Sequence, residues 1–339
     1  GATAAALPLR LLPGSNSVIA GPGMKLLSTR GLQVGGLMTV TEGEVRVPTS
    51  TSGVIDVLPG GQLDFNAASP PVGLHCDTLP CLVDMSVQGT VRQQGSARPV
   101  LELSNPLQVA GGSLQVGAGG LQVNDILLQA GSVDVLAGAQ LQTATVTLTG
   151  GELRGGGQIV GDVINNAGTV RPGTSPGLLS VSGDYTQGAS GLMVMEVAGN
   201  TPGSGYDRLH ASGSATLDGT LTVVNAGYTP VSPEALNLIL SDVAVNGTFA
   251  STNVPYAGYA ISYSVGTVDL APAGPTALVV NTTADLGTGT CDVAECTLRE
   301  AITAANGAAG PDVIEFNIPA PQCTGPGGAC VIQPLTPLP

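Results

Sequence analysis

Four acidic side chains in the most repetitive part of the chain are of the type that binds or cleaves polysaccharides. They are Asp64, Asp134, Glu152 and Asp162. Such chemistry needs clustered carboxylates, often holding Ca²⁺, and a basic residue that takes a proton or stabilises charge. The four lie far apart in the sequence, and no DxD or paired-carboxylate motif joins them. We expect solvated side chains on outward strand positions, with a polysaccharide lyase or hydrolase as the alternative.

Other groups that could bind a metal or transfer a proton are few. The two histidines are His75 and His210, and a single histidine in a loop is most often a surface residue. Asp285, Asp292 and Glu295 could hold Ca²⁺ beside a loop bounded by cysteines. We expect no catalytic residue, no metal site and no cofactor, with Ca²⁺ as the one ion left open.

Two further patterns have simpler structural interpretations. Threonines occupy alternate positions over 143–149, as in a surface that binds ice or another crystal. The neighbouring repeats do not carry them, so β-propensity is the better explanation. The run Tyr206-Asp207-Arg208 is interpreted as stabilising the fold rather than as catalytic.

The six cysteines form three close pairs in stretches rich in Gly, Pro or Asp, and none has the CxxC spacing of a metal site. The pairs are Cys76 with Cys81, Cys291 with Cys296, and Cys323 with Cys330. An even number of cysteines in such loops predicts disulfides and an oxidising compartment, extracellular or on the bacterial cell surface. The alternative is six free thiols in a cytosolic protein.

Composition narrows the possible partners. The 339 residues include 10 basic and 24 acidic side chains, a net charge of -14, which removes the electrostatic basis for binding nucleic acid. No apolar run is long enough to span a membrane, and the first residues lack the pattern of a signal peptide. We therefore expect a mature chain with no membrane insertion in this segment.

Short strands preceded by glycine recur along the chain. One series begins at Gly112, Gly131, Gly151 and Gly168, at offsets of 19, 20 and 17 residues. A second begins at Gly120, Gly138, Gly157 and Gly177, and an earlier pair begins at Gly43 and Gly61. Apolar and polar residues alternate within most of these units, which is typical of half-buried strands.

A period near 19 residues with two or three short strands predicts an all-β fold, a right-handed parallel β-helix over 31–183. An antiparallel sandwich or barrel is the alternative, but its strands would recur every 8 to 12 residues or so. Residues 66–84 interrupt the period and contain Cys76 and Cys81, so we expect a disulfide-bearing loop there. Residues 1–30 are expected to cap the first turn of the helix or to dock on a neighbour.

The period is lost after residue 183, and most of the aromatic residues lie beyond it. We expect residues 184–272 to form a β-rich capping module and 276–339 a small disulfide-containing domain. That domain carries the one predicted helix, because Thr297 and Glu300 form a capping box before Ala301 and a glycine at 307 ends the helical pattern.

Two stretches resemble known families. The run Gly168-Thr169-Val170-Arg171-Pro172-Gly173, with Gly183-Asp184-Tyr185 and Tyr206-Asp207-Arg208, resembles the end of an autotransporter-type passenger β-helix over about residues 150–225. The run Cys296-Thr297-Leu298-Arg299-Glu300-Ala301, with Cys291-Asp292 and Asp312-Val313-Ile314, resembles the CSLREA domain of large secreted bacterial surface proteins. Thr297 stands where that family's name has Ser. That domain usually leads into a further β-helix, so the resemblance implies a truncated segment; neither family contributes a catalytic residue.

Together these features predict a non-enzymatic extracellular structural or adhesive protein, a cell-surface stalk or fibre subunit. Its expected partners are further copies joined end to end, or glycans of a host or cell surface. The alternatives are a carbohydrate-active β-helix enzyme and a glycan-binding adhesin.

Overall fold

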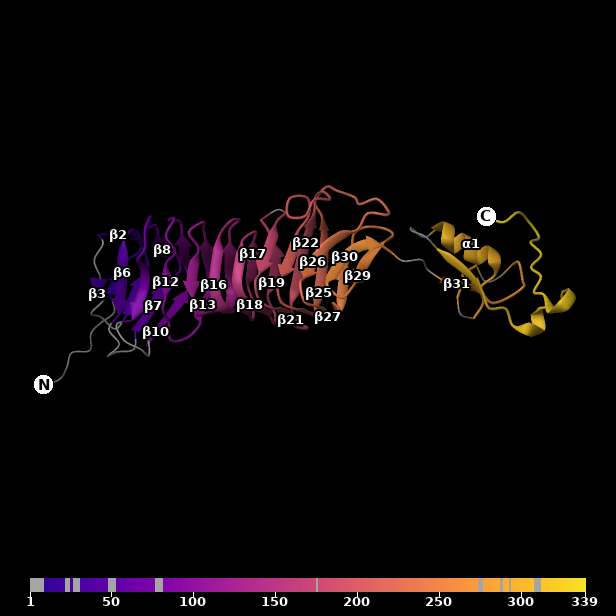
Figure 1. The fold of residues 1–339 in the computed structure, drawn as a ribbon, viewed down its shortest axis with the longest axis horizontal. Coiled ribbons are helices and arrows are strands. Elements are labelled where there is room, and N and C mark those ends of the chain that lie inside the picture. Colours follow the sequence, from indigo (N-terminus) through magenta and orange to yellow (C-terminus); the bar gives the residue numbers. More distant parts are fainter. Residues whose placement is uncertain are drawn as a thin grey trace. The chain divides into compact units, whose positions relative to one another are not determined.

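The computed structural model describes residues 9–21, 25–26, 31–47, 53–76, 82–174, 176–273, 277–286, 289–292, 294–307 and 312–339. These residues are mainly β-strand, as expected, with one α-helix near the C-terminus (Figure 1). None of the described helices has the length and apolar character needed to cross a membrane. The chain divides into a larger unit, Gly1–Thr229 with Leu236–Asn253 and Tyr263–Asp269, and a smaller unit made of the remaining residues.

The larger unit contains a long sheet in which strands pair in three rows, with parallel pairing wherever the register is defined (Figure 1). Row 1 consists of β1 (Leu9–Leu11), β4 (Gly31–Val34), β7 (Gly53–Val57), β10 (Val83–Val87), the first part of β13 (Leu107–Val116) and β15 (Asp125–Val135), the second part of β16 (Gln140–Leu148) and β18 (Gln158–Asn165), β21 (Tyr185–Gln187), β24 (Ala215–Leu217) and β27 (Val245–Gly247). Row 2 consists of β2 (Asn16–Ile19), β5 (Leu37–Val40), β8 (Gln62–Phe65), β11 (Thr90–Gln93), the second part of β13 and β15, β17 (Glu152–Gly155), β19 (Thr169–Pro172), β22 (Leu192–Val197), β25 (Thr220–Asn225) and β28 (Ser251–Asn253).

Row 3 consists of β3 (Lys25–Leu26), β6 (Gly43–Val47), β9 (Val72–Cys76), β12 (Val100–Leu101), β14 (Leu121–Val123), the first part of β16 and β18, β20 (Leu178–Val181), β23 (Arg208–Ala211), β26 (Leu236–Ser241) and β30 (Thr267–Pro272). Strand β29 (Tyr259–Tyr263) precedes β30. The strands beyond residue 183 therefore join the same three rows, although the sequence period is lost there.

Alternation of residue type explains why each strand has a buried side. In row 2, one apolar side chain per strand stacks on its equivalent in the next strand, and all of them are almost completely buried. This ladder consists of Met38, Leu63, Val91, Leu114, Val133, Leu153, Val170, Met193 and Leu221. Burying each such side chain contributes about 1.5–3 kcal/mol, so the ladder is a main source of stability.

One ladder of row 1 changes from apolar to polar side chains. Leu148 is followed by Asn165 and then by Gln187, all of them buried. The side-chain oxygen of Asn165 accepts a hydrogen bond from Gly168 N (2.8 Å), and that of Gln187 accepts one from the Tyr185 hydroxyl (2.7 Å). Burial also raises the pKa of Tyr185, so this hydroxyl remains a donor. The buried amides are hydrogen-bonded, as burial of a polar group requires.

The structure confirms one predicted repeat alignment and corrects two others. Strand starts at 113, 132, 152 and 169 stack in register, as predicted. In the second series Leu121 stacks on Leu141 rather than on Ala139, because buried leucines, not the preceding glycines, determine the register. The pair beginning at Gly43 and Gly61 is not stacked at all, since β6 and β8 belong to different rows.

The expectation of a loop over 66–84 is also wrong in part. Strand β9 lies within it and pairs with β6 on one side and β12 on the other. The alternation of Val72 and Leu74, both buried, supplies the inward side chains that a strand of row 3 needs. Residues 77–81, with Cys81, lie outside the described residues, as does the side chain of Cys76.

The smaller unit includes a second sheet, in which β31 (Ala277–Val280) pairs in parallel with β32 (Val313–Phe316). Its helix α1 (Leu298–Gly307) begins with the predicted capping box: Glu300 N donates to Thr297 Oγ1 (3.2 Å), and Thr297 N donates to Glu300 Oε2 (2.9 Å). The 3₁₀ helices η1 (Ala320–Gln322) and η2 (Pro326–Gly328) follow. The core of this unit is centred on Val280, Cys296 and Ala301.

Truncation within the row 2 ladder should destabilise the larger unit strongly. Leu153 is completely buried between Val133 and Val170, so Leu153→Ala removes contacts on both sides and leaves a cavity. We expect a loss of about 2–5 kcal/mol in the free energy of unfolding, measured by chemical denaturation. The outward Thr147→Ala, on row 1, is the control and should change stability by less than about 0.5 kcal/mol. Equal effects of the two substitutions would contradict the ladder.

Candidate functional site

The outward side of row 2 carries a run of polar side chains that stack on one another in register. We call it the charged row, and it consists of Asp64, Arg92, Gln115, Asp134, Arg154 and Arg171. Asp64 and Asp134 are only 5% exposed although they point away from the apolar ladder. Charges that are this close and this poorly hydrated require partners of opposite sign.

Each buried carboxylate of the charged row has an arginine in the next strand. Arg92 binds Asp64 through Nε and Nη2, at 3.0 and 2.9 Å. Arg154 makes the same two-point contact with Asp134. Hydrogen bonding to the carboxylate raises the pKa of both arginines. The pairs therefore stay ionised and join consecutive strands.

Arg154 and Arg171 stack directly on one another, which would be repulsive without a neighbouring acid. Glu152 supplies it, because it points outward two residues before Arg154 on β17. Its carboxylate lies 2.9 Å from Arg171 Nε and also attracts Arg154. Four side chains of alternating charge thus form one network.

A pocket of about 410 Å³ opens at this end of the charged row. It is lined by Gln115, Asp134, Leu136, Glu152, Arg154, Arg171, Gly173, Thr174, Glu196 and Asp207. The sequence pattern missed Gln115, Arg154, Arg171 and Glu196, because residues separated by 17–25 positions become neighbours only through the strand register. Repeat alignment could have found the first three.

Asp207 lines the pocket but is only 2% exposed. Its two carboxyl oxygens accept hydrogen bonds from Gly177 N (2.7 Å) and Glu196 N (2.8 Å). Burial raises its pKa to about 7. Asp207 therefore joins β22 to the segment that precedes β20, in agreement with its predicted structural role. The neighbouring Arg208 donates to Asn237 O and to the Tyr206 hydroxyl.

The expectation of isolated, solvated carboxylates was wrong for three of the four acids. Asp64 and Asp134 are buried and paired with arginines, and Glu152 lies in the same pocket as Asp134. Only Asp162 is exposed, on row 1, where it accepts a hydrogen bond from Asp184 N. Parallel stacking brings together residues that the sequence separates.

The two histidines are also placed by strands. His75 lies on β9 rather than in a loop, and its side chain is 16% exposed between Glu44 (3.7 Å) and Glu102 (3.3 Å). The expectation that His75 is a surface residue in a loop is therefore wrong. His210, on β23, contacts Asp242 at 2.9 Å.

The threonines and the acids proposed for Ca²⁺ do not assemble into sites. Thr145 stacks between Asp125 and Asp162, so neighbouring strands do not extend the threonine pattern, as predicted. Asp285 and Asp292 have separate protein partners. Within the described ranges, no group of three or more His, Cys, Asp or Glu side chains is arranged to hold a metal ion.

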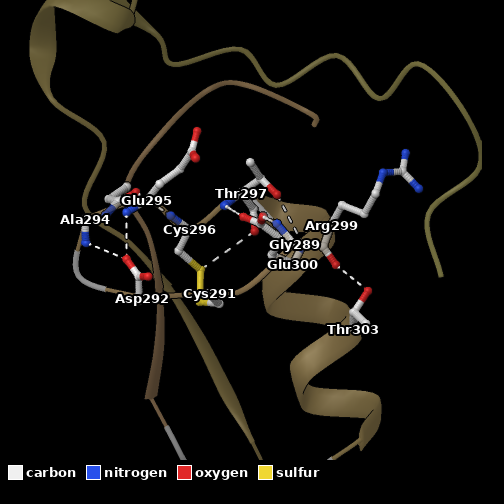
Figure 2. The surroundings of a disulfide bond; sticks show 11 residues. Gly289, Cys291, Asp292, Ala294, Glu295, Cys296, Thr297, Arg299, Glu300 and Thr303 are labelled. Atoms are coloured by element: carbon white, nitrogen blue, oxygen red, sulfur yellow. Dashed lines mark hydrogen bonds between the residues drawn. A yellow bond between two sulfur atoms is a disulfide. The ribbon is translucent and has the colours of Figure 1, made fainter. Parts of the chain in front are cut away.

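Two of the three expected cysteine pairs are disulfides in the smaller unit, Cys291–Cys296 and Cys323–Cys330. Figure 2 shows the first of them beside the start of α1. The Asp292 carboxylate accepts hydrogen bonds from Ala294 N and Glu295 N (2.8 and 3.0 Å), which shapes the loop between the two cysteines. The Cys76–Cys81 pair lies outside the described residues and stays a prediction.

Asp285 and Arg299 hold the last part of the chain through main-chain groups. The Asp285 carboxylate accepts a hydrogen bond from Leu335 N (2.7 Å), and Arg299 donates to Thr336 O and Pro337 O (both 2.8 Å). The two side chains also pair at 3.0 Å, and hydrogen bonding to Arg299 lowers the pKa of Asp285. We call these five residues the tail clasp.

No family model matches the chain, and no curated protein matches it.

Replacing Asp207 by Asn should remove part of the pH dependence of stability. The pKa of Asp207 rises from 3.8 to about 7 on folding, so its stabilising effect is complete below about pH 4 and is lost as the pH rises through 7. Between about pH 5 and pH 8 the wild type should lose on the order of 2 kcal/mol more than Asp207→Asn. Unfolding midpoints measured across this range test it. Asp56→Asn, on row 1, should keep the wild-type profile, and parallel wild-type and Asp207→Asn curves would refute the assignment.

Arg299→Gln should release the tail clasp. The variant loses the ion pair to Asp285 and the donors to the two carbonyls, so the amide of Leu335 should exchange its hydrogen faster. Hydrogen–deuterium exchange with mass spectrometry reads this directly. Thr303→Ala, on the same helix, is the control and should leave exchange in the tail unchanged. Unchanged exchange in Arg299→Gln would show that other contacts hold the segment.

Proposed function

We propose that the three rows form a right-handed parallel β-helix and that the protein is a non-enzymatic extracellular structural or adhesive element, a cell-surface stalk or fibre subunit. The observation that carries this proposal is the unbroken row pairing from β1 to β28. Connections between parallel strands of one sheet are right-handed in about 98% of cases, which supports the hand. Among the described residues each row contains eleven strands or parts of strands, and eleven layers at about 4.8 Å each make a rod about 50 Å long.

The arrangement of side chains supports a mechanical role. Hydrogen bonds run along all three rows, apolar ladders fill the inward side, and ion pairs join strands on the outward side. Each interaction links one layer to the next, so bending or unfolding the rod must break several at once. Such a structure projects an attached part without needing a chemical site of its own.

The disulfides support an oxidising compartment outside the cytoplasm. In the smaller unit, the capping box and the neighbouring disulfide are formed by the residues that carry the resemblance to a CSLREA domain, which supports that assignment. The resemblance of residues 150–225 to an autotransporter-type passenger β-helix agrees with the row pairing there. We therefore propose secretion to the bacterial surface.

Two observations favour a structural role over the carbohydrate-active enzyme. Asp207 has the raised pKa of a general acid, but it is buried and both of its oxygens accept main-chain hydrogen bonds, so a substrate has no access to it. Asp134 and Glu152 are engaged by arginines. A nucleophile or base among these groups would first have to give up its partner.

The ends of the rows offer a route to end-to-end association. Within the ranges that the structure describes, β1, β2 and β28 pair with a strand on one side only. Strand β27 pairs with β24 and also donates from Val245 N to Val265 O (2.6 Å), so its outer edge is partly covered. Apolar side chains are exposed near both ends, with Leu12 and Val18 at 61% and 65% and Val243 at 62%. Unpaired strand edges of this kind accept further strands, which would suit a fibre subunit.

Electron microscopy of the purified whole chain, combined with polysaccharide depolymerisation assays, tests this function. We expect particles containing a rod about 50 Å long, single or joined into filaments. We also expect no depolymerisation of acidic or neutral polysaccharides with or without Ca²⁺. Joined rods should separate when residues 1–30 are deleted, and rods that stay joined would exclude docking by that segment. Compact particles without a rod, or cleavage of a polysaccharide, would contradict the proposal.

A further inference from the structure

The pocket at the end of the charged row differs from the rest of that surface because it is concave and holds unused polar groups. Its volume of about 410 Å³ lies within the range of about 300–1,000 Å³ of small-molecule sites. Its wall comes from five strands of row 2, β13, β15, β17, β19 and β22, together with Leu136, Gly173, Thr174 and Asp207. The hydrogen-bonded strands make it a rigid, preformed site.

Most of the charge in the pocket is already neutralised. Asp134 is paired with Arg154, and Glu152 with Arg171. Asp207 is engaged by two main-chain N–H groups and is largely protonated below neutral pH. The charge of the Glu196 carboxylate is not neutralised in this way. This carboxylate is half-buried and makes no hydrogen bond or ion pair to any residue that the structure describes.

The unused groups include donors as well as acceptors. The contact of Arg171 with Glu152 uses Nε, which leaves the N–H groups of its two terminal nitrogens free of partners among the described residues. Gln115 adds an amide, and Thr174 a hydroxyl. A ligand that fits must accept a hydrogen bond from the Arg171 guanidinium and donate one to the Glu196 carboxylate at the same time.

Three ligand classes fit poorly. An anion would need a free guanidinium, but both arginines are paired with acids and the pocket carries excess negative charge. An apolar ligand would contact only one apolar side chain of the lining, Leu136. A cation would be attracted by Glu196 but would lie among two arginine side chains.

A neutral polyol satisfies both sides of the pocket. Each hydroxyl both donates and accepts, so a vicinal diol can donate to Glu196 and accept from Arg171 without breaking an ion pair. We propose that this pocket binds one neutral sugar residue of a glycan, with Glu196, Arg171 and Thr174 as its contacts. The rod would then carry its own adhesive site, which goes beyond a purely structural function.

Saturation-transfer difference NMR on the whole chain tests the site with glucose, galactose, mannose and N-acetylglucosamine as neutral probes. Galacturonate and glucosamine serve as the anionic and cationic probes. The lining has no aromatic ring for stacking, so we expect a dissociation constant of about 1–10 mM for at least one neutral sugar. The two charged sugars should bind more weakly.

Glu196→Gln keeps the main-chain bond to Asp207 and removes only the carboxylate, so it should weaken sugar binding about tenfold without changing the unfolding midpoint. Thr174→Ala is the second pocket variant and should weaken binding as well, because it removes a hydroxyl from the pocket lining. Asp56→Asn, on row 1, is the matched control and should bind like the wild type.

The proposal fails if no neutral sugar binds, if only galacturonate or only glucosamine binds, or if binding survives both pocket substitutions. The last outcome would place the sugar elsewhere on the surface. None of these results bears on the rod itself, which electron microscopy measures, so the two proposals fail independently.

Discussion

Parallel, in-register stacking of strands is the constraint on which the rest of the larger unit depends. Each strand hydrogen-bonds to its equivalents one layer before and one layer after, so a side chain meets its counterpart about 4.8 Å away. On the inward side this spacing favours stacks of apolar side chains, and leucine, valine and methionine follow one another from Met38 to Leu221. Outward, the same spacing places charges in contact, where like pairs repel. The composition of the chain, apolar and poor in charge, follows from this geometry.

The few charges that remain are arranged to satisfy the stacking. Asp64 is followed by Arg92, and Asp134 by Arg154, so two pairs alternate in sign from one layer to the next. Only Arg154 and Arg171 break the alternation, and Glu152 compensates from the same face. Because these carboxylates are nearly buried, removing one partner would leave a poorly hydrated charge, which is costlier than losing a surface ion pair. The charged row therefore specifies register as well as contributing stability.

The sequence was sufficient to predict strands, parallel stacking of the main repeat series and the helix at Leu298. These features depend on local alternation, glycine positions and a capping box, all of which are visible within a few residues. The sequence was not sufficient to predict the register of Leu141, because that register depends on which leucines are buried and not on the glycines. It was also not sufficient to predict β9, because the insertion that contains this strand still supplies inward side chains. The pocket could not be predicted from the sequence for the same reason. Glu196 and Gln115 are 81 positions apart in sequence, and only the accumulated register of several layers brings them to one site.

The pocket lies where the repeat itself changes. Up to Arg171, each member of the charged row has a polar neighbour in the next strand, but the residue after Arg171 in this register belongs to β22 and is the buried Val194. The chain beyond β22 turns back through Asp207, whose carboxyl accepts hydrogen bonds from Gly177 N and Glu196 N and so ties this turn to β22 and to the segment before β20. The buried carboxyl therefore costs some stability above neutral pH while it holds one wall of the pocket in place.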